Sequence, residues 1–438
     1  MKILHVSIGL PPLRKGGLVR YCMDLINAQQ KAGDEVALLF PGSHKIGKNT
    51  TIKQNYFGGI KVFEVVNPLP VALTFGIGNP CSFMETADSP SYKTLLELWS
   101  PDVIHVHSIM GIHKEFFELA HKMGIRIVFT THDYYPICLR CCFVNVDGIL
   151  CDGPSGEKCA NCNFKSGITK TSSFIMQSQM YKSLKQTSFM KRINNRAKNL
   201  MIDRCNKDVV SLEIVEEYQK LLNYYTRTML LMDKLLCNSE LTKSIYFKYF
   251  PSIESVYLPI THDFLPNCCL DRSNARNNEV VLGYMGGTNP CKGLNILLDA
   301  LYYLDHYRIK WKLFLYGDDY GDFIDDERII DKGSYCFSDE MSVFRDLDVV
   351  IVPSVWPETF SFITLEALLS GVPVVCSDTV GAKDLVPKDL IFESGNPVSL
   401  ARVLVDLING NIAKATVLDK KKYDMETHCV CVKRQYQS

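Results

Sequence analysis

Glu358 and Glu366, with seven residues between them, stand in the segment of this sequence that most strongly predicts a ligand site. Residues 348–378 predict a buried strand, a loop carrying Glu358, a helix that begins near Ser361 and carries Glu366, and a second strand. Ligands of open α/β sheets bind outside the carboxyl ends of the strands, where this loop must lie. The N–H groups of a helix start suit a phosphate, and ionised carboxylates accept from hydroxyls. A nucleotide sugar offers sugar hydroxyls, a diphosphate and ribose hydroxyls in that order.

A second phosphate-binding pattern lies upstream, at residues 283–300, GYMGGTNPCKGLNILLDA. Lys292 precedes a glycine and opens a helix after a predicted strand. An ammonium group and a helix dipole attract a phosphate together. The alternative is an exposed lysine at an ordinary helix start.

The N-terminal half offers a glycine loop and a histidine. Gly16 and Gly17, in PPLRKGGLVR, follow the first predicted strand and allow a ligand to approach the backbone. His132 follows a buried strand and is expected to face a crevice, although a lone histidine is more often structural. Its neighbour Asp133 could orient the ring. Of the two histidines in the strand DVIHVH, at residues 105 and 107, at least one is expected in the core.

Six cysteines fall within residues 138–162. Cys138-x2-Cys141 and Cys159-x2-Cys162 are separated by 17 residues, a spacing typical of structural zinc. The alternatives are four zinc ligands or unligated reduced thiols. Neither gives the cysteines a catalytic role, since four thiolates leave no open position.

Predicted strands alternate with helices in both halves of the chain. Strands rich in Val, Ile and Leu indicate parallel sheets covered on both faces, so the fold class is α/β with two doubly wound, Rossmann-like domains. The predicted strands are Lys2–Ser7, Glu35–Phe40, Ile60–Val65, Val103–Val106, Arg126–Thr130, Val280–Met285, Trp311–Leu315, Val349–Val352 and Val372–Cys376, and the predicted helices Gly17–Ala32, Lys114–Met123, Leu294–Leu304 and Phe362–Leu369.

The domains are expected at residues 1–265 and 280–410, joined by a polar linker at 266–279. The tail 411–438 is expected to return to the N-terminal domain. Residues 163–235 predict a helical insertion whose first part, 163–207, holds ten Lys/Arg and one acid. This basic part is either a solvated surface or a face that meets an anionic membrane or a lipid phosphate.

The composition is that of a soluble globular protein. Lys+Arg and Asp+Glu balance at 48 each in 438 residues, which argues against a nucleic-acid partner. No stretch reaches the roughly 18 apolar residues of a membrane span. The first residues resemble no export signal, so the 17 cysteines are expected in the cytosol, as reduced thiols or metal ligands.

The string P-S-x-x-P-E-x-F-x-x-x-x-x-E-A-x-x-x-G-x-P-V-V resembles the E-x7-E signature of family 4 glycosyltransferases. The resemblance implies the GT-B fold, in which two Rossmann-like domains face each other across a cleft. It implies that Glu358 holds the transferred sugar and Glu366 the ribose. It also implies that Lys292 and the helix start at Ser361, Phe362 and Ile363 hold the diphosphate.

The same resemblance implies that Gly16 and Gly17 approach the donor phosphate and that His132 bonds the donor sugar. The implied reaction is transfer from a nucleotide sugar, with a UDP-sugar favoured, to a glycan or lipid-linked acceptor. It proceeds with retention and without a catalytic metal. The setting implied by analogy is bacterial surface-polysaccharide synthesis in the cytoplasm, with peripheral contact at the inner face of the plasma membrane.

Two departures from the family pattern keep other functions open. Ser361 stands where relatives usually have glycine, and Gly286 stands where many have arginine. The alternatives are a GT-B nucleotide-sugar epimerase and a catalytically inactive partner subunit.

Overall fold

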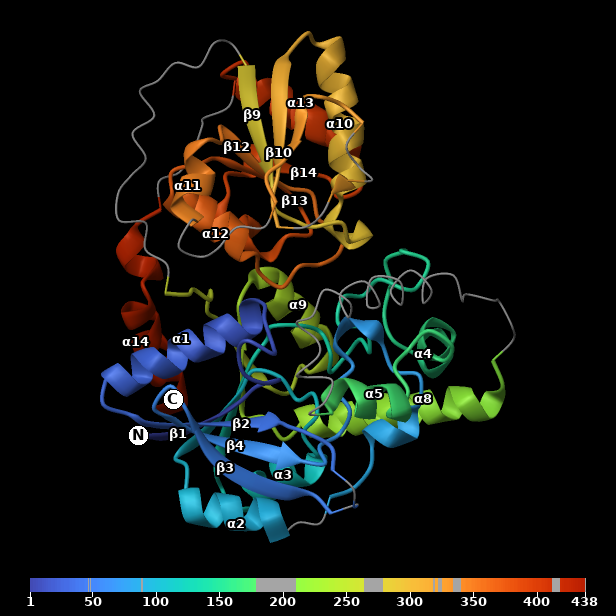
Figure 1. Cartoon of the computed structure of the whole chain (residues 1–438), viewed down its shortest axis with the longest axis vertical. Helices are drawn as coiled ribbons and strands as arrows, with labels where there is room; N and C mark the ends of the chain where they lie inside the picture. The colour runs from blue at the N-terminus through green and yellow to red at the C-terminus, as the bar shows by residue number, and fades with distance from the viewer. Residues whose placement is uncertain are drawn as a thin grey trace. The chain divides into compact units, whose positions relative to one another are not determined.

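The computed structural model describes residues 1–45, 47, 49–87, 90–178, 210–263, 279–317, 320–321, 325–333, 340–411 and 418–437. These residues form two compact units (Figure 1). The first contains Met1–Asn238, Lys243–Leu258 and Cys429–Ser438, and the second contains Ser239–Thr242 and Pro259–His428. The expected linker 266–279 lies outside the described residues apart from its last residue, as does most of the basic part 163–207.

The first unit is built on an eight-stranded sheet with the order β3-β4-β2-β1-β5-β6-β7-β8. Only β3 runs antiparallel to its neighbour, and the other strands pair in parallel. The strands are β1 Lys2–Val6, β2 Glu35–Pro41, β3 Thr51–Phe57, β4 Ile60–Val66, β5 Val103–Val106, β6 Arg126–Thr130, β7 Lys234–Cys237 and β8 Glu254–Tyr257.

Helices cover this sheet by burying apolar stripes at helical spacing. Helix α1, Gly17–Lys31, for example, buries Cys22, Leu25, Ile26 and Gln29. The remaining helices of the first half are α2 Pro90–Trp99, α3 Lys114–Lys122, α4 Gly156–Asn163, α5 Lys170–Gln177, α8 Leu212–Met229 and α9 Glu240–Tyr249. Within the described part of the chain, no helix is long and apolar enough to cross a membrane.

The second unit contains a six-stranded, all-parallel sheet with the order β11-β10-β9-β12-β13-β14. Its strands are β9 Glu279–Tyr284, β10 Lys310–Leu315, β11 Ile329–Asp331, β12 Val349–Val352, β13 Val374–Ser377 and β14 Ile391–Phe392. The helices are α10 Leu294–His306, α11 Glu340–Arg345, α12 Phe362–Leu369 and α13 Pro397–Ile408, and Figure 1 shows α10, α12 and α13 beside the sheet. Helix α14, Met425–Gln437, begins in the second unit and ends in the first.

The two parallel-sheet α/β domains confirm the predicted fold class. Every predicted strand forms, within one or two residues at its ends. The strand expected from Val372 begins at Val374, because Pro373 has no N–H to donate to a ladder. Strands β3, β7, β8, β11 and β14 were not predicted.

We predict that Gly293 is required where the loops after β9 and β12 touch. Its φ is +74°, and an added Cβ would lie 1.8 Å from the Pro353 carbonyl oxygen. Gly395 has the same φ of +74° with no atom within 4 Å of an added Cβ. A substitution there therefore measures the free-energy cost of the backbone conformation without a steric clash. Gly395→Ala should lose about 1 kcal/mol of unfolding free energy. Gly293→Ala should lose about 1–3 kcal/mol more, because backbone must move. Denaturant titration measures both, and equal losses would contradict the close contact.

Candidate functional site

In both sheets, predicted site residues other than His132 follow the strands at which the strand order reverses. In the first sheet the order reverses between β1 and β5, and in the second between β9 and β12. Gly16 and Gly17 follow β1, Lys292 follows β9, and Glu358 follows β12. The crevice outside the carboxyl ends of such strands is the ligand-binding position of open α/β sheets. The topology thus places each group where a ligand would bind in its own unit.

The turn that carries Lys292 is tied to the loop after β12. Lys292 ends a 3-10 turn, and the Asn289 side chain caps that turn by accepting from the Cys291 N–H at 3.0 Å. The Cys291 carbonyl in turn accepts from the Val355 N–H at 2.9 Å. This backbone bond holds the two loops in register beside Gly293.

Because the loops are joined, Lys292 and Glu358 meet although 66 positions separate them. Their ammonium and carboxylate groups form an ion pair in which the lysine is 34% and the glutamate 7% exposed. The ammonium also lies 5.3 Å from the centre of the Trp356 ring. Trp356 was not singled out from the sequence, because only the fold brings its ring beneath the lysine.

The backbone of Glu358 is held on both sides. Its N–H donates to the Thr379 carbonyl at 2.9 Å, and its carbonyl accepts from the Gly381 N–H at 2.9 Å. A Cβ on Gly381 would lie 2.3 Å from the Thr359 carbonyl oxygen, so only glycine permits this approach. The carboxylate therefore projects from a fixed loop, which suits a group that must orient a ligand.

A tyrosine fills the space at Gly286, where an arginine was expected in relatives. A Cβ on Gly286 would lie 2.3 Å from the hydroxyl oxygen of Tyr284 and 2.5 Å from its Cζ. The Tyr284 hydroxyl donates to the Gly287 carbonyl at 2.8 Å, and its ring is buried. An arginine at position 286 would therefore have to displace Tyr284, so adding that cation is not a simple gain in phosphate affinity.

Helix α12 begins at a strained residue. Ser361 has φ +131° and ψ +98°, a backbone conformation that residues other than glycine rarely adopt. Its hydroxyl caps the helix by accepting from Thr364, at 3.4 Å from the N–H and 3.0 Å from the side-chain hydroxyl. The next residues, Phe362 and Ile363, begin the helix, where backbone N–H groups have no partner within it. The N–H groups of these two residues could bind an anion.

Glu366 lies in the second turn of α12 and is 3% exposed. Its carboxylate lies 2.6 Å from Nε2 of His262, which is also buried. The Phe362 ring meets the His262 ring edge to face, with centroids 4.8 Å apart. His262 is a site residue that the sequence analysis missed, because it follows β8 and no local pattern links it to α12.

In the first unit, Gly16 has φ +115° and leaves open space where a Cβ would stand. Gly17 then begins α1, whose first turn carries no acidic residue. The glycine loop thus leads directly into the start of α1, as predicted, and a phosphate could approach the backbone N–H groups there. Arg20 pairs with Asp24 at 3.8 Å within the same helix.

His132 follows β6, and its side chain meets another histidine. Its Nε2 lies 3.2 Å from Nδ1 of His107, and its ring lies 4.9 Å from that of Tyr21. Asp133, the expected orienting acid, instead accepts the Tyr135 N–H at 2.8 Å. Burial raises the pKa of the Asp133 carboxyl to about 6. His107 is thus an orienting partner of His132 that the sequence analysis did not identify.

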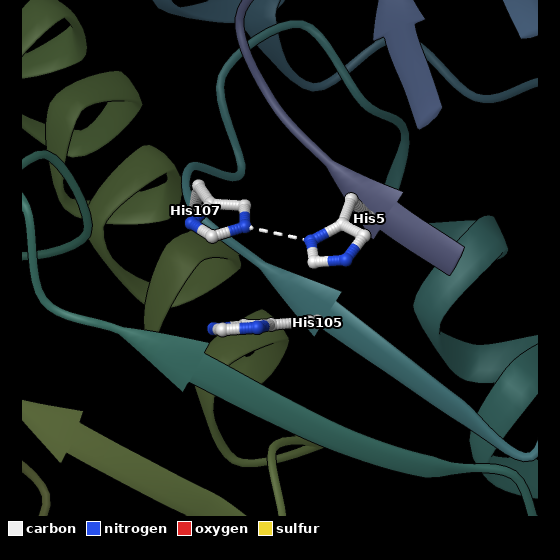
Figure 2. A group of neighbouring side chains, drawn as sticks. All are labelled: His5, His105 and His107. Atoms are coloured by element: carbon white, nitrogen blue, oxygen red, sulfur yellow. Dashed lines mark hydrogen bonds between the residues drawn. The ribbon is translucent and has the colours of Figure 1, made fainter. Parts of the chain in front are cut away.

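The expectation that at least one histidine of DVIHVH is internal is confirmed, since His105 and His107 are both buried. With His5 they form the one group in the described residues whose potential metal-ligand atoms lie within 4.8 Å of one another (Figure 2). The rings of His5 and His107 are stacked, with an interplanar angle of 10°, whereas the His105 ring is tilted by 38° to His5 and by 32° to His107. Each ring nitrogen of the three histidines lies within hydrogen-bond distance of another side chain. The group is therefore hydrogen-bonded.

The four predicted zinc ligands all lie in the first unit, but among the described residues no three of their sulfur atoms lie within 4.8 Å of one another. The Cys141 thiol donates to the Leu73 carbonyl at 3.2 Å. Burial raises the pKa of Cys138 and Cys162 to about 11 and of Cys159 to about 12. Zinc binding would require these thiols to deprotonate and Cys141 to leave Leu73.

Comparison with known families identifies both halves of the chain. The family model "Glycosyltransferase Family 4" matches residues 15–151, and the model "Glycosyl transferases group 1" matches residues 279–410. The first match includes β2 to β6 with Gly16, Gly17 and His132, and the second includes β9 to β14 with Lys292, Glu358 and Glu366. The chain therefore carries two glycosyltransferase domains of the GT-B fold, the family 4 domain in its N-terminal half and the group 1 domain in its C-terminal half.

Individual relatives agree with this class. The lipopolysaccharide 1,2-N-acetylglucosaminetransferase of Salmonella typhimurium is 27% identical over 224 residues. That match covers 44% of this chain and 59% of the relative, which is less than two thirds of its length. Sucrose-phosphate synthase from Thermosynechococcus elongatus has a similar fold, with a TM-score of 0.58 at 12% identity over 100% of this chain and 98% of that one. Anabaena HepE in complex with UDP and glucose gives a TM-score of 0.54 at 15% identity over 100% of both chains.

We predict that Ser361→Gly stabilises the second unit. Glycine adopts φ +131° without the strain of about 1–3 kcal/mol, and replacing a serine cap by glycine costs only a few tenths. The unfolding free energy should therefore rise by about 1 kcal/mol. Ser361→Ala keeps the strain and loses the cap, so it should lower stability by about 1 kcal/mol. A glycine variant less stable than the unmodified chain in denaturant unfolding would show that the cap outweighs the strain.

Proposed function

We propose that the chain is a retaining, E-x7-E type glycosyltransferase that transfers a hexosyl group from a UDP-sugar to a glycan or lipid-linked acceptor. The observation that carries this proposal is the meeting of Lys292 with Glu358 at the carboxyl ends of β9 and β12, beside the start of α12. A cation and helix N–H groups suit a diphosphate. Buried carboxylates on the same loop and helix suit hydroxyls.

In the proposed reaction the donor loses the bond between its anomeric carbon and the diphosphate oxygen. The acceptor oxygen forms its bond to that carbon on the same face, and the acceptor's proton passes to the leaving diphosphate. Lys292 and the N–H groups of Phe362 and Ile363 stabilise the charge that develops on the leaving group. The Gly16 and Gly17 loop approaches the donor phosphate.

The sugar and the nucleoside are held by separate carboxylates. Glu358 accepts from hydroxyls of the transferred sugar, and Glu366, oriented by His262, accepts from the ribose. His132 bonds the sugar near the reacting carbon and so contributes by positioning. No catalytic metal is required in this scheme.

The relatives favour this substrate class. One is named a lipopolysaccharide N-acetylglucosaminetransferase, and HepE has been solved with UDP and with UDP-glucose. By analogy we assign the chain to bacterial surface-polysaccharide synthesis in the cytoplasm. Peripheral contact with the inner face of the plasma membrane is a further proposal, supported by the Lys/Arg-rich residues 163–207.

A panel of UDP-, GDP- and ADP-sugars tests the function directly. We expect slow hydrolysis of one UDP-sugar without acceptor and net transfer once a glycan acceptor is supplied. Release of a rearranged nucleotide sugar would indicate an epimerase. Absence of nucleoside diphosphate binding in a titration would indicate an inactive subunit, and either result would overturn the proposal.

We predict that the two glutamates act on different parts of the donor. Glu366→Gln should weaken UDP binding by about 1.5–3 kcal/mol, the range for a charge-assisted hydrogen bond. Glu358→Gln should lower kcat strongly with little change in UDP affinity. Calorimetric titration and steady-state rates measure both, with the exposed Glu393→Gln of the same unit as control. Equal losses of UDP affinity at positions 358 and 366 would contradict the division of roles.

We also propose that the loop 138–162 binds one structural zinc through Cys138, Cys141, Cys159 and Cys162. Elemental analysis of protein purified without added metal should find about one zinc per chain. Cys159→Ser should abolish it and lower thermal stability and turnover while UDP affinity is kept, because the loop lies in the first unit. Exposed Cys81→Ser is the matched control. A metal-free preparation with full activity and the same melting temperature would refute the zinc.

A further inference from the structure

A chain of hydrogen bonds runs through the core of the first unit to His132. Gln29, near the end of α1, places its Oε1 2.7 Å from Nε2 of His5. Nδ1 of His5 lies 3.0 Å from Nε2 of His107, the contact drawn in Figure 2. Nδ1 of His107 lies 3.2 Å from Nε2 of His132. The three partners behind His132 are all buried.

The protons of this chain are interdependent. A neutral imidazole has one donor and one acceptor nitrogen, and an amide oxygen only accepts. Since Gln29 Oε1 accepts, His5 carries its proton on Nε2, and its Nδ1 accepts. His107 must then donate from Nε2 and accept at Nδ1, so His132 donates from Nε2. The unprotonated nitrogen of His132 is therefore Nδ1.

The Gln29 side-chain amide has a second hydrogen-bond partner on the side away from His5. Its amide Nε2 donates to the Tyr436 hydroxyl at 2.9 Å. That hydroxyl lies 2.7 Å from Nδ1 of His105, and Nε2 of His105 lies 2.7 Å from the Thr130 hydroxyl. If the Gln29 amide were reversed, its NH2 would face His5, and every donor and acceptor along the chain would exchange. In the structure the amide nitrogen faces Tyr436, 407 positions away, and the amide oxygen faces His5, and this orientation gives the direction described above.

This order of donors and acceptors requires that the rings of His5 and His107 are neutral, and their burial favours the neutral form. Burial lowers the pKa of His5 to about 4. Burial, together with the neighbouring His105, His5 and His132, holds the pKa of His107 well below its usual value. Near pH 7 neither ring carries a second proton that would break the sequence of donors and acceptors.

We propose that Gln29, His5 and His107 are positioning residues that fix the proton of His132 on Nε2, leaving Nδ1 as a hydrogen-bond acceptor for the donor sugar. The link to the sugar rests on the proposed function, whereas the proton position follows from the orientation of Gln29 and the contacts of the chain. Which imidazole nitrogen is protonated is set by the hydrogen bond that the other makes, so the chain selects one of two tautomers.

The test measures the tautomer of His132 directly. The full-length protein is labelled with 15N at histidine, and its ring signals at pH 7.5 are recorded without substrate. Comparison with His132→Gln assigns the His132 signals. We expect a protonated Nε2 and an unprotonated Nδ1 in the unmodified chain. In Gln29→Met, which keeps the length but removes the acceptor, both signals should move toward the average of the two tautomers.

Tyr92→Phe is the matched control, because it removes a buried hydrogen bond to a histidine of the same unit, His113, that lies off the chain. It should leave the His132 signals unchanged. A protonated Nδ1 in the unmodified chain, or an unchanged tautomer in Gln29→Met, would overturn the proposal. The first of these outcomes needs no variant and so does not depend on Gln29→Met folding.

Turnover separates this proposal from the proposed function. Gln29→Met should lower kcat roughly fivefold, the factor for a net hydrogen bond of ordinary strength, with UDP affinity unchanged. If the tautomer shifts while kcat stays the same, the chain stands and the assigned role of His132 at the sugar falls.

Discussion

The contact on which the proposed donor site depends is a close approach of two backbones in the second unit. The loop after β9 crosses the loop after β12 with Gly293 against the Pro353 carbonyl and with Cys291 bonded to Val355. Any side chain at position 293 would push the loops apart. Lys292 and Glu358 would then separate, because each is placed by its own loop. A glycine that makes no contact with the donor in the proposed scheme thus controls the geometry of two residues that do.

Buried polar groups of the candidate sites are held by partners rather than by solvent. Glu366 is held by His262, Glu358 by Lys292, and His132 is linked through His107 and His5 to Gln29. Because an unpaired polar group in the interior costs about 1–3 kcal/mol, these networks restrict the side chains to few orientations. In the proposed mechanism, this restriction matters more than the acid or base strength of any side chain, since the acceptor's proton passes to the leaving diphosphate.

The two departures from the family pattern have different physical consequences. At position 361 the backbone still adopts the conformation that suits glycine, so serine is strained but gains a helix cap. At position 286 the space is filled by the Tyr284 ring, which is bonded to the Gly287 carbonyl. Neither change removes Lys292 or the N–H groups at the start of α12. The observations therefore favour an active donor site over an inactive subunit.

The sequence by itself determined the fold class, the central strands and most of the candidate site, because buried parallel strands and glycine-bounded helix starts are local patterns. Continuous Val/Ile runs marked β1, β5, β9 and β12, and the residues after them were identified by type and spacing. Strand β7 was missed because helices were predicted up to residue 235, and β14 was missed because its two residues carry no periodicity. The sequence analysis missed four other residues for a different reason: His262, Trp356, Gln29 and Tyr436. Their roles arise only from contacts across tens or hundreds of positions, and such long-range pairing is decided by how the sheets and helices pack in three dimensions.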